Sequence, residues 1–206
     1  RMPEGMWLSE TAVDHETLDL LAEHGIKFTI LGPHQAKRIR KIGQDAWTEI
    51  TKETLDITKP YLCILPSGRR IAIFFYDAAI SGEVAFGNLL DNGDRFCKRL
   101  IDAFSKEIGT PQLLSLATDG ETYGHHHRFA DMALAYAIHE IETKELAKIT
   151  IYGEYLEMFP PKDEVAIAEN TSWSCVHGVK RWEDDCGCRA QYACLISDTT
   201  VCYPAS

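Results

Sequence analysis

The sequence SLATDGETYGHHH, residues 115–127, is the stretch from which the fold class is inferred. Its beginning continues an apolar run, residues 113–117, that predicts a short buried strand. A polar cluster from Asp119 to His127 follows, and apolar residues at helical spacing then predict a helix to about Lys144. In α/β proteins, ligands and catalytic groups gather in loops at the carboxyl ends of strands. This order of strand, polar loop and helix therefore predicts an α/β protein with a functional loop here.

The polar loop also has a plain interpretation. Asp119 would cap the turn that follows it, and the histidines at 125–127 would be solvated side chains. Single residues fit either interpretation equally well. The whole set following one strand favours function, because loops carry binding and catalytic residues disproportionately.

A βαβ unit is predicted at the start of the chain. We expect a strand within residues 2–7, a helix from the cap Asp14 to about Glu23, and a strand over 26–31. Polar loops carrying Glu10 and His34 follow the two strands. Such units belong to sheets with parallel strands.

The middle of the chain has a looser pattern, which we interpret as an insertion at about residues 45–88. Residues 36–42 predict one or two basic helical turns, and residues 62–65 and 70–76 predict a hairpin. A helix from Asn92 to about Ile108 and a strand over 147–152 follow. We expect the strand-end residues to share one rim of the sheet: Glu10, His34, Asp119 and Glu154.

Composition narrows the classes of partner. The chain has 206 residues, 45% hydrophobic and 25% charged, as in one ordinary globular domain. Its net charge of −10 argues against nucleic acid or an anionic membrane as partner and fits a neutral substrate such as a sugar. No apolar run has the length of a membrane span, and no signal peptide opens the chain. A cytoplasmic location is the expectation, and the oligomeric state stays open.

The cysteines crowd the end of the chain. Five of the seven lie in the last 32 residues, and the odd total fits a reduced compartment better than a disulfide framework. Buried thiols are the preferred interpretation. A structural zinc bound by Cys175, His177, Cys186 and Cys188 is the alternative, although the spacing departs from common zinc fingers. Residues 189–206 show no pattern and are expected to be an irregular tail.

Two strand-end carboxylates, Glu10 and Asp119, form a candidate catalytic pair. Glycoside cleavage needs one carboxylate at the anomeric carbon and one acid at the leaving oxygen. Trp7 would offer a sugar ring an apolar face. We expect the substrate to contact a wider set of side chains: Trp7, His34, Glu121, Tyr123, His125 and His126.

Two motifs resemble those of glycoside hydrolase family 57. GMWLSE, residues 5–10, resembles its W-L-x-E motif, and DGETYG, residues 119–124, resembles its D-G-E-x-[FY]-G motif. Runs at 171–175, 177–178 and 185–188 are similar to those of its subgroup with a DUF3536 region. The resemblance covers about residues 2–188.

The resemblance implies an enzyme acting on α-glucans such as starch, glycogen or maltodextrin. It implies a (β/α)7 barrel, a retaining mechanism with Glu10 as nucleophile and Asp119 as acid/base, and neither cofactor nor catalytic metal. The family's first motifs would precede Arg1 and its helical region would follow Cys188. We therefore expect residues 1–188 to be an incomplete catalytic barrel that lacks its N-terminal strands.

Two other functions remain open. Asp119 and the histidines at 125–127 offer oxygen and nitrogen ligands, so a metal-dependent hydrolase of carbohydrate is one alternative. An inactive carbohydrate-binding fragment is the other, because part of the barrel would be absent.

Overall fold

The computed structural model describes residues 2–105 and 109–188. Within them the chain forms two compact units. Of the described residues, unit 1 contains 2–55, 60–74 and 161–188, and unit 2 contains 56–59, 75–105 and 109–160. None of the helices in the described ranges has the length and apolar character needed to cross a lipid bilayer. The predicted tail at 189–206 lies outside the described residues.

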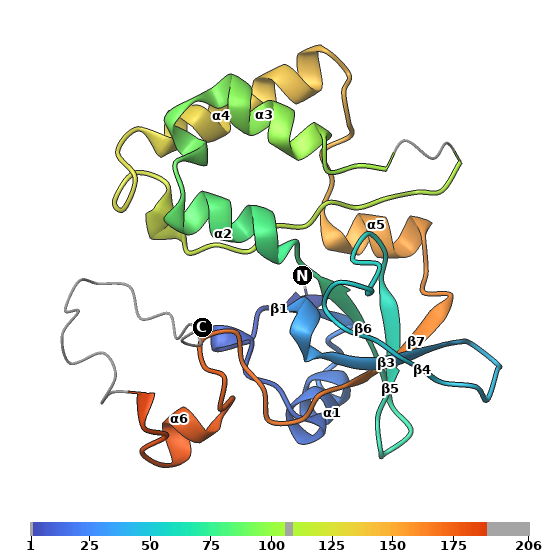
Figure 1. Cartoon of the computed structure of the whole chain (residues 1–206). Helices are drawn as coiled ribbons and strands as arrows, with labels where there is room; N and C mark the ends of the chain where they lie inside the picture. Colours follow the sequence, from blue (N-terminus) through green and yellow to red (C-terminus); the bar gives the residue numbers. More distant parts are fainter. Residues whose placement is uncertain (1, 106–108, 189–206) are drawn as a thin grey trace. The chain divides into compact units, whose positions relative to one another are not determined.

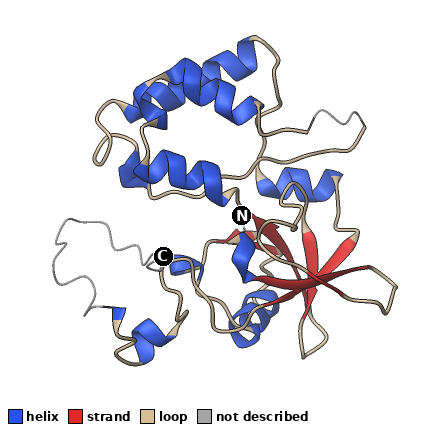
Figure 2. Cartoon of the chain, viewed as in Figure 1, coloured by secondary structure: helices blue, strands red, loops and turns tan. Residues whose placement is uncertain are grey.

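Unit 1 is built on a mixed sheet, drawn in red in Figure 2. Seven strands are described, in the order β1-β2-β6-β5-β7-β3-β4. Their bounds are Gly5–Met6 (β1), Phe28–Leu31 (β2), Ala36–Lys41 (β3), Thr48–Glu49 (β4), Tyr61–Ile64 (β5), Arg70–Phe75 (β6) and Asp163–Ile167 (β7). β1 with β2 and β5 with β7 pair in parallel, whereas β5 with β6, β3 with β7 and β3 with β4 are antiparallel.

The predicted βαβ unit is confirmed. Strand β1 leads to α1, His15–Glu23, which the Asp14 carboxylate caps by accepting a hydrogen bond from Thr17 N at 2.7 Å. β2 then runs parallel to β1 and is buried along its length. The predicted β5–β6 hairpin is present as well, and it lies inside the sheet, between β2 and β7. That residues 45–88 are an insertion into a barrel stays a prediction.

Unit 2 is helical in the part described, and α2, α3 and α4 are labelled in Figure 1. Its helices are α2 (Ala78–Phe86), α3 (Gly93–Ile101), α4 (Ala130–Thr143) and α5 (Tyr152–Met158). Side chains such as Ile80, Phe96 and Ala137 form one buried cluster that joins α2, α3 and α4. Asn92 caps α3 through Arg95 N at 2.9 Å, as the sequence predicted for the start of this helix. The remaining described helix, α6 (Lys180–Glu183), belongs to unit 1.

Residues 36–42 are not helical turns, and this prediction was wrong. Strand β3 occupies residues 36–41 and pairs with β7, which lies far away in the sequence. Its basic side chains meet acidic ones on β7: Arg40 Nη2 lies 2.6 Å from Glu164 Oε2, and Lys41 Nζ lies 2.8 Å from Asp163 Oδ1. Tertiary pairing therefore overrides the local basic pattern.

The predicted strands at 113–117 and 147–152 were also wrong. In the first segment, Ser115 O accepts from Asp77 N at 2.7 Å and Leu113 N donates to Thr58 O at 2.8 Å, which is not a strand ladder. In place of the second, helix α5 begins at Tyr152, and Glu154 lies on that helix. Glu10 and His34 follow parallel strands as expected, but Asp119 and Glu154 follow no strand.

Candidate active site

Glu10 lies in a strained turn directly after β1. The turn is the 3-10 segment Ser9–Thr11 (η1), in which Glu10 has φ 56° and Thr11 has φ 51°. Non-glycine residues in this left-handed region each cost about 1–3 kcal/mol, and they cluster at functional sites. Contacts at both residues hold the turn: Glu10 O accepts from Trp173 N at 2.9 Å, and Thr11 O accepts from the Gln35 amide at 2.8 Å.

The Glu10 carboxylate is held by a hydrogen bond from the indole of Trp173. Trp173 Nε1 donates to Glu10 Oε2 at 3.0 Å. The Trp173 ring in turn meets Trp7 edge to face, with ring centroids 5.1 Å apart. Trp7 is 42% exposed, so one aromatic surface beside the Glu10 turn faces solvent. A hydrogen-bonded carboxylate and a partly exposed aromatic side chain therefore lie in the same part of unit 1.

His34 follows β2 in the 3-10 segment Pro33–Gln35 (η2). Its Nε2 lies 3.1 Å from Ser172 O, and because a carbonyl oxygen only accepts, Nε2 carries the hydrogen. Although part of the side chain reaches solvent, desolvation by its surroundings lowers the pKa of His34, and the nearby Lys52 charge lowers it further. The Ser172 hydrogen bond opposes this shift in pKa. The ring is thus favoured in its neutral form, with Nδ1 as an acceptor.

The Gln35 side chain links the Glu10 turn to the Pro33–Gln35 segment by hydrogen bonds. Its role was not predicted from the sequence. Gln35 is fully buried; its Oε1 accepts from Gly32 N at 2.8 Å, and its Nε2 donates to Thr11 O and to Thr171 Oγ1. The hydrogen bond from Trp173 to Glu10 was likewise not predicted from the sequence. The available signals were a polar residue next to His34 and a tryptophan within the Thr171–Cys175 run.

The Asp119 loop has a different character. Asp119 is the N-cap residue of the 3-10 segment Gly120–Thr122 (η4). Backbone hydrogen bonds close the loop, such as the one from His126 N to Glu121 O at 2.9 Å. His127 Nε2 donates to Ala85 O at 2.8 Å and anchors the loop. The acidic and imidazole side chains before it are exposed: Asp119, Glu121, His125 and His126.

The sequence-predicted residues divide between the two units. Unit 1 holds Trp7, Glu10 and His34, whereas unit 2 holds Asp119, Glu121, Tyr123, His125 and His126. Tyr123 is half-buried, and its hydroxyl lies 3.3 Å from Thr118 Oγ1. The pairing of Glu10 with Asp119 therefore stays a prediction.

Metal-binding geometry is found elsewhere. In the described residues, the one group of three or more ligand-type side chains that converges is Cys175, His177, Cys186 and Cys188. Asp119 and the histidines at 125–127 do not form such a group, although all of them lie in unit 2.

Comparison with known proteins places these residues in context. A family model described as glycosyl hydrolase family 57 matches residues 1–168. The 4-alpha-glucanotransferase of Thermococcus litoralis has a similar fold, with a TM-score of 0.60 and 20% identity, over 92% of this chain and 30% of that one. The exo-type maltose-forming amylase of Pyrococcus sp. ST04 has a TM-score of 0.61 and 15% identity, over 84% of this chain and 29% of that one. No curated protein sequence matched. The chain spans less than a third of either similar structure.

Proposed function

The chain belongs to glycosyl hydrolase family 57, and we propose on that premise that it cleaves or transfers the linkages of α-glucans such as starch, glycogen or maltodextrin. The names of the two similar structures, a 4-alpha-glucanotransferase and a maltose-forming amylase, support this substrate class. The observation that carries the proposal is Glu10, a carboxylate held in a strained turn and hydrogen-bonded by Trp173.

Finer assignments belong to the same proposal. The α/β fold with its mixed sheet is part of a (β/α)7 barrel, and the chain is close to the DUF3536 subgroup. The motif runs at 171–175 and 185–188 support the subgroup, and the parallel β1 and β2 with their strand-end residues support the barrel. A cytoplasmic location is part of the same proposal, and it is supported by Cys63 and Cys97, two buried thiols that form no disulfide.

In the proposed mechanism Glu10 attacks the anomeric carbon and forms a glycosyl ester. Asp119 first donates a proton to the leaving glycosidic oxygen, and it then accepts one from the water or sugar hydroxyl that releases the product. Direct attack requires the two carboxyl groups to come within about 5–5.5 Å of each other. Trp7 stacks on a sugar ring, and His34, Glu121, Tyr123, His125 and His126 bind hydroxyl groups.

The strained turn suits the role of nucleophile. A carboxylate that already points along its line of attack does not lose rotamer freedom when substrate binds. The Trp173 N–H stabilises the ionised carboxylate and leaves its other oxygen, Oε1, available to the substrate. An uncharged donor does this without adding a cation that would compete for the carboxylate.

The stereochemistry of the product tests the assignment. With maltodextrin and the complete gene product that contains this chain, we expect NMR to show that the first product keeps the α configuration. Glu10→Ala should be inactive, and azide should restore turnover with a product of inverted, β configuration, because azide attacks from the face that Glu10 vacates. An inverted product from the parent, or full activity in Glu10→Ala, would contradict the proposal.

The alternatives give different outcomes in the same assay. A carbohydrate-binding fragment would bind maltodextrin through Trp7 without turnover, and Trp7→Ala would weaken that binding. A metal-dependent hydrolase would lose activity with a chelator and keep it in Glu10→Ala. The observed grouping of ligand-type side chains does not favour that second alternative.

A further inference from the structure

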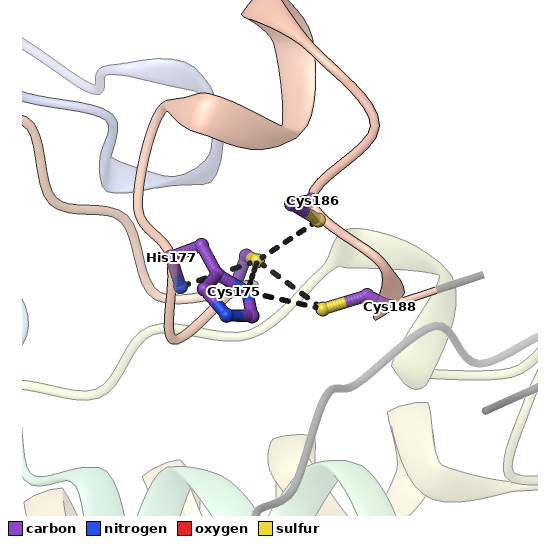
Figure 3. Close-up of side chains that lie close together, drawn as sticks. All are labelled: Cys175, His177, Cys186 and Cys188. Atoms are coloured by element: carbon purple, nitrogen blue, oxygen red, sulfur yellow. Dashed lines mark hydrogen bonds between the residues drawn. The ribbon is translucent and has the colours of Figure 1, made fainter. Parts of the chain in front are cut away.

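Four side chains near the end of the described chain converge on one point. Cys175, His177, Cys186 and Cys188 place one ligand atom each, all within 4.8 Å of one another, and Figure 3 shows them pointing inward. Cys175 Sγ lies 3.8 Å from Cys186 Sγ and 3.7 Å from Cys188 Sγ. His177 Nδ1 lies 3.7 Å from Cys175 Sγ and 3.4 Å from Cys188 Sγ. None of these four residues, called the Cys175–Cys188 cluster below, belongs to the Glu10 turn or to the Asp119 loop.

These four separations are close to the edge lengths of a tetrahedron around one zinc ion, and the other two are within 4.8 Å. Zn–S bonds of about 2.3 Å and tetrahedral angles place two sulfur ligands about 3.8 Å apart. With a Zn–N bond of about 2.0–2.1 Å, a sulfur and a nitrogen ligand lie about 3.5–3.6 Å apart. A disulfide instead needs sulfurs at about 2.05 Å. The observed sulfur separations of 3.7 and 3.8 Å therefore fit a shared metal and not a disulfide.

The backbone is shaped for these positions. Gly178, after His177, has φ 61°, and a Cβ there would meet Asn170 O at 1.8 Å. Gly187, between Cys186 and Cys188, has φ 79°. The left-handed φ of both turns favours glycine. His177 N also lies 3.4 Å from Cys175 Sγ, and such N–H donors stabilise the thiolate form that binds metal.

The segment around the cluster has little else to hold it. Its helix α6 has four residues and no buried side chain, and Val176 and Trp182 are exposed. Simple buried thiols were the sequence-based expectation, but only Cys175 is buried, and Cys186 and Cys188 are half-exposed. Small elements without a core of their own are commonly stabilised by a structural metal.

We propose that Cys175, His177, Cys186 and Cys188 bind one structural Zn²⁺. Three thiolates and one imidazole make a closed four-coordinate set, which leaves no open position for a catalytic water. The ion fixes the segment that carries Trp173, whose indole bonds to Glu10, two residues before Cys175. The site thereby stabilises the approach to the Glu10 turn without taking part in chemistry.

Metal analysis of the purified chain is the direct test. We expect about one zinc per chain by plasma mass spectrometry, and a loss of at least about tenfold in Cys186→Ser and His177→Ala. Cys97→Ala and His139→Ala are matched controls from α3 and α4, and both should keep the zinc. Zinc retained in Cys186→Ser or His177→Ala would overturn the proposal, as would a Cys–Cys disulfide in the parent protein.

A cobalt measurement keeps the test decisive if a variant fails to fold. The parent chain is stripped of metal with a chelator under reducing conditions and titrated with Co²⁺. We expect the visible absorption of tetrahedral, thiolate-bound cobalt, saturating at one equivalent and bleached by Zn²⁺. No such absorption from a protein that keeps its native circular dichroism would overturn the proposal. Both readouts are independent of any glycosidase activity, so their failure leaves the proposed function in place.

Discussion

The Glu10 turn and the Asp119 loop carry the two proposed catalytic carboxylates in opposite ways. Glu10 is half-buried, strained at φ 56°, and fixed by Trp173 through both its backbone oxygen and its carboxylate. Asp119 is exposed, and its side chain accepts no capping hydrogen bond from a backbone N–H of the described residues. The Glu10 carboxylate is therefore held by its neighbours, whereas the Asp119 side chain is open to solvent.

This difference in burial and hydrogen bonding corresponds to the two proposed roles, nucleophile for Glu10 and general acid/base for Asp119. A nucleophile gains from fixed orientation, because misplacement by about 1 Å can cost roughly 100-fold in rate. A general acid/base must change protonation state twice in each cycle, so contact with water is compatible with its work. The strain in the Glu10 turn, of about 1–3 kcal/mol per residue, is offset by the bonds from Gln35 and Trp173.

Among the substitutions that test this comparison, we expect the largest effect on activity at Asp119. Asp119→Asn removes the proton donor, so kcat/KM on maltodextrin should fall by about 10²–10⁴-fold. On aryl glycosides with acidic leaving groups, which need no proton, the first chemical step should be nearly unaffected. Steady-state and burst kinetics on both substrates measure the contrast.

Asp131→Asn, at an exposed aspartate in the first turn of α4, is the matched control for charge removal and should behave as the parent. An equal loss on both kinds of substrate would show that Asp119 is not the acid/base. The two loops would then not divide the chemistry as proposed.

The second effect is expected at Trp173. Trp173→Phe keeps an aromatic ring against Trp7 and keeps the backbone bond to Glu10 O, but it removes the Nε1–H donor. A hydrogen bond to a charged group contributes about 1.5–3 kcal/mol, so we expect kcat/KM to fall by about 10- to 100-fold. Trp182→Phe, at an exposed tryptophan, should have no effect. Full activity in Trp173→Phe would mean that the carboxylate does not depend on the indole.

The sequence predicted features that depend on neighbouring residues, and it did not predict contacts between residues far apart in the chain. The helix starts at Asp14 and Asn92 and the motif around Glu10 are local patterns, and each was found. The Trp173–Glu10 bond joins residues 163 positions apart, and no local pattern encodes it. Strand β3 was missed because its positive charges are neutralised by Asp163 and Glu164, and that pairing appears only in the folded chain.

At the apolar run 113–117, a local pattern gave a wrong prediction. Its composition is that of a strand, but its polar groups bond to a loop and to side chains, as where Ala117 N donates to Ser81 Oγ at 3.1 Å. Short apolar runs have several possible partners, and periodicity alone does not choose among them. The prediction of a functional loop at Asp119 used this strand together with the polar side chains, and it now rests on the side chains and the motif alone.

The smallest expected effect is on stability, and it comes from His34, in the segment that follows β2. Because the pKa of His34 is lowered in the folded state, the unfolded chain binds a proton more readily as the pH falls below about 6.5. His34 should therefore cost stability from about pH 6.5 downward and contribute nothing of this kind above it. Denaturant unfolding at about pH 7.5 and about pH 5.5 should show that the parent loses more stability than His34→Gln, which keeps an N–H donor for Ser172 O. Equal losses in the parent and in His34→Gln would refute the expected contribution of His34.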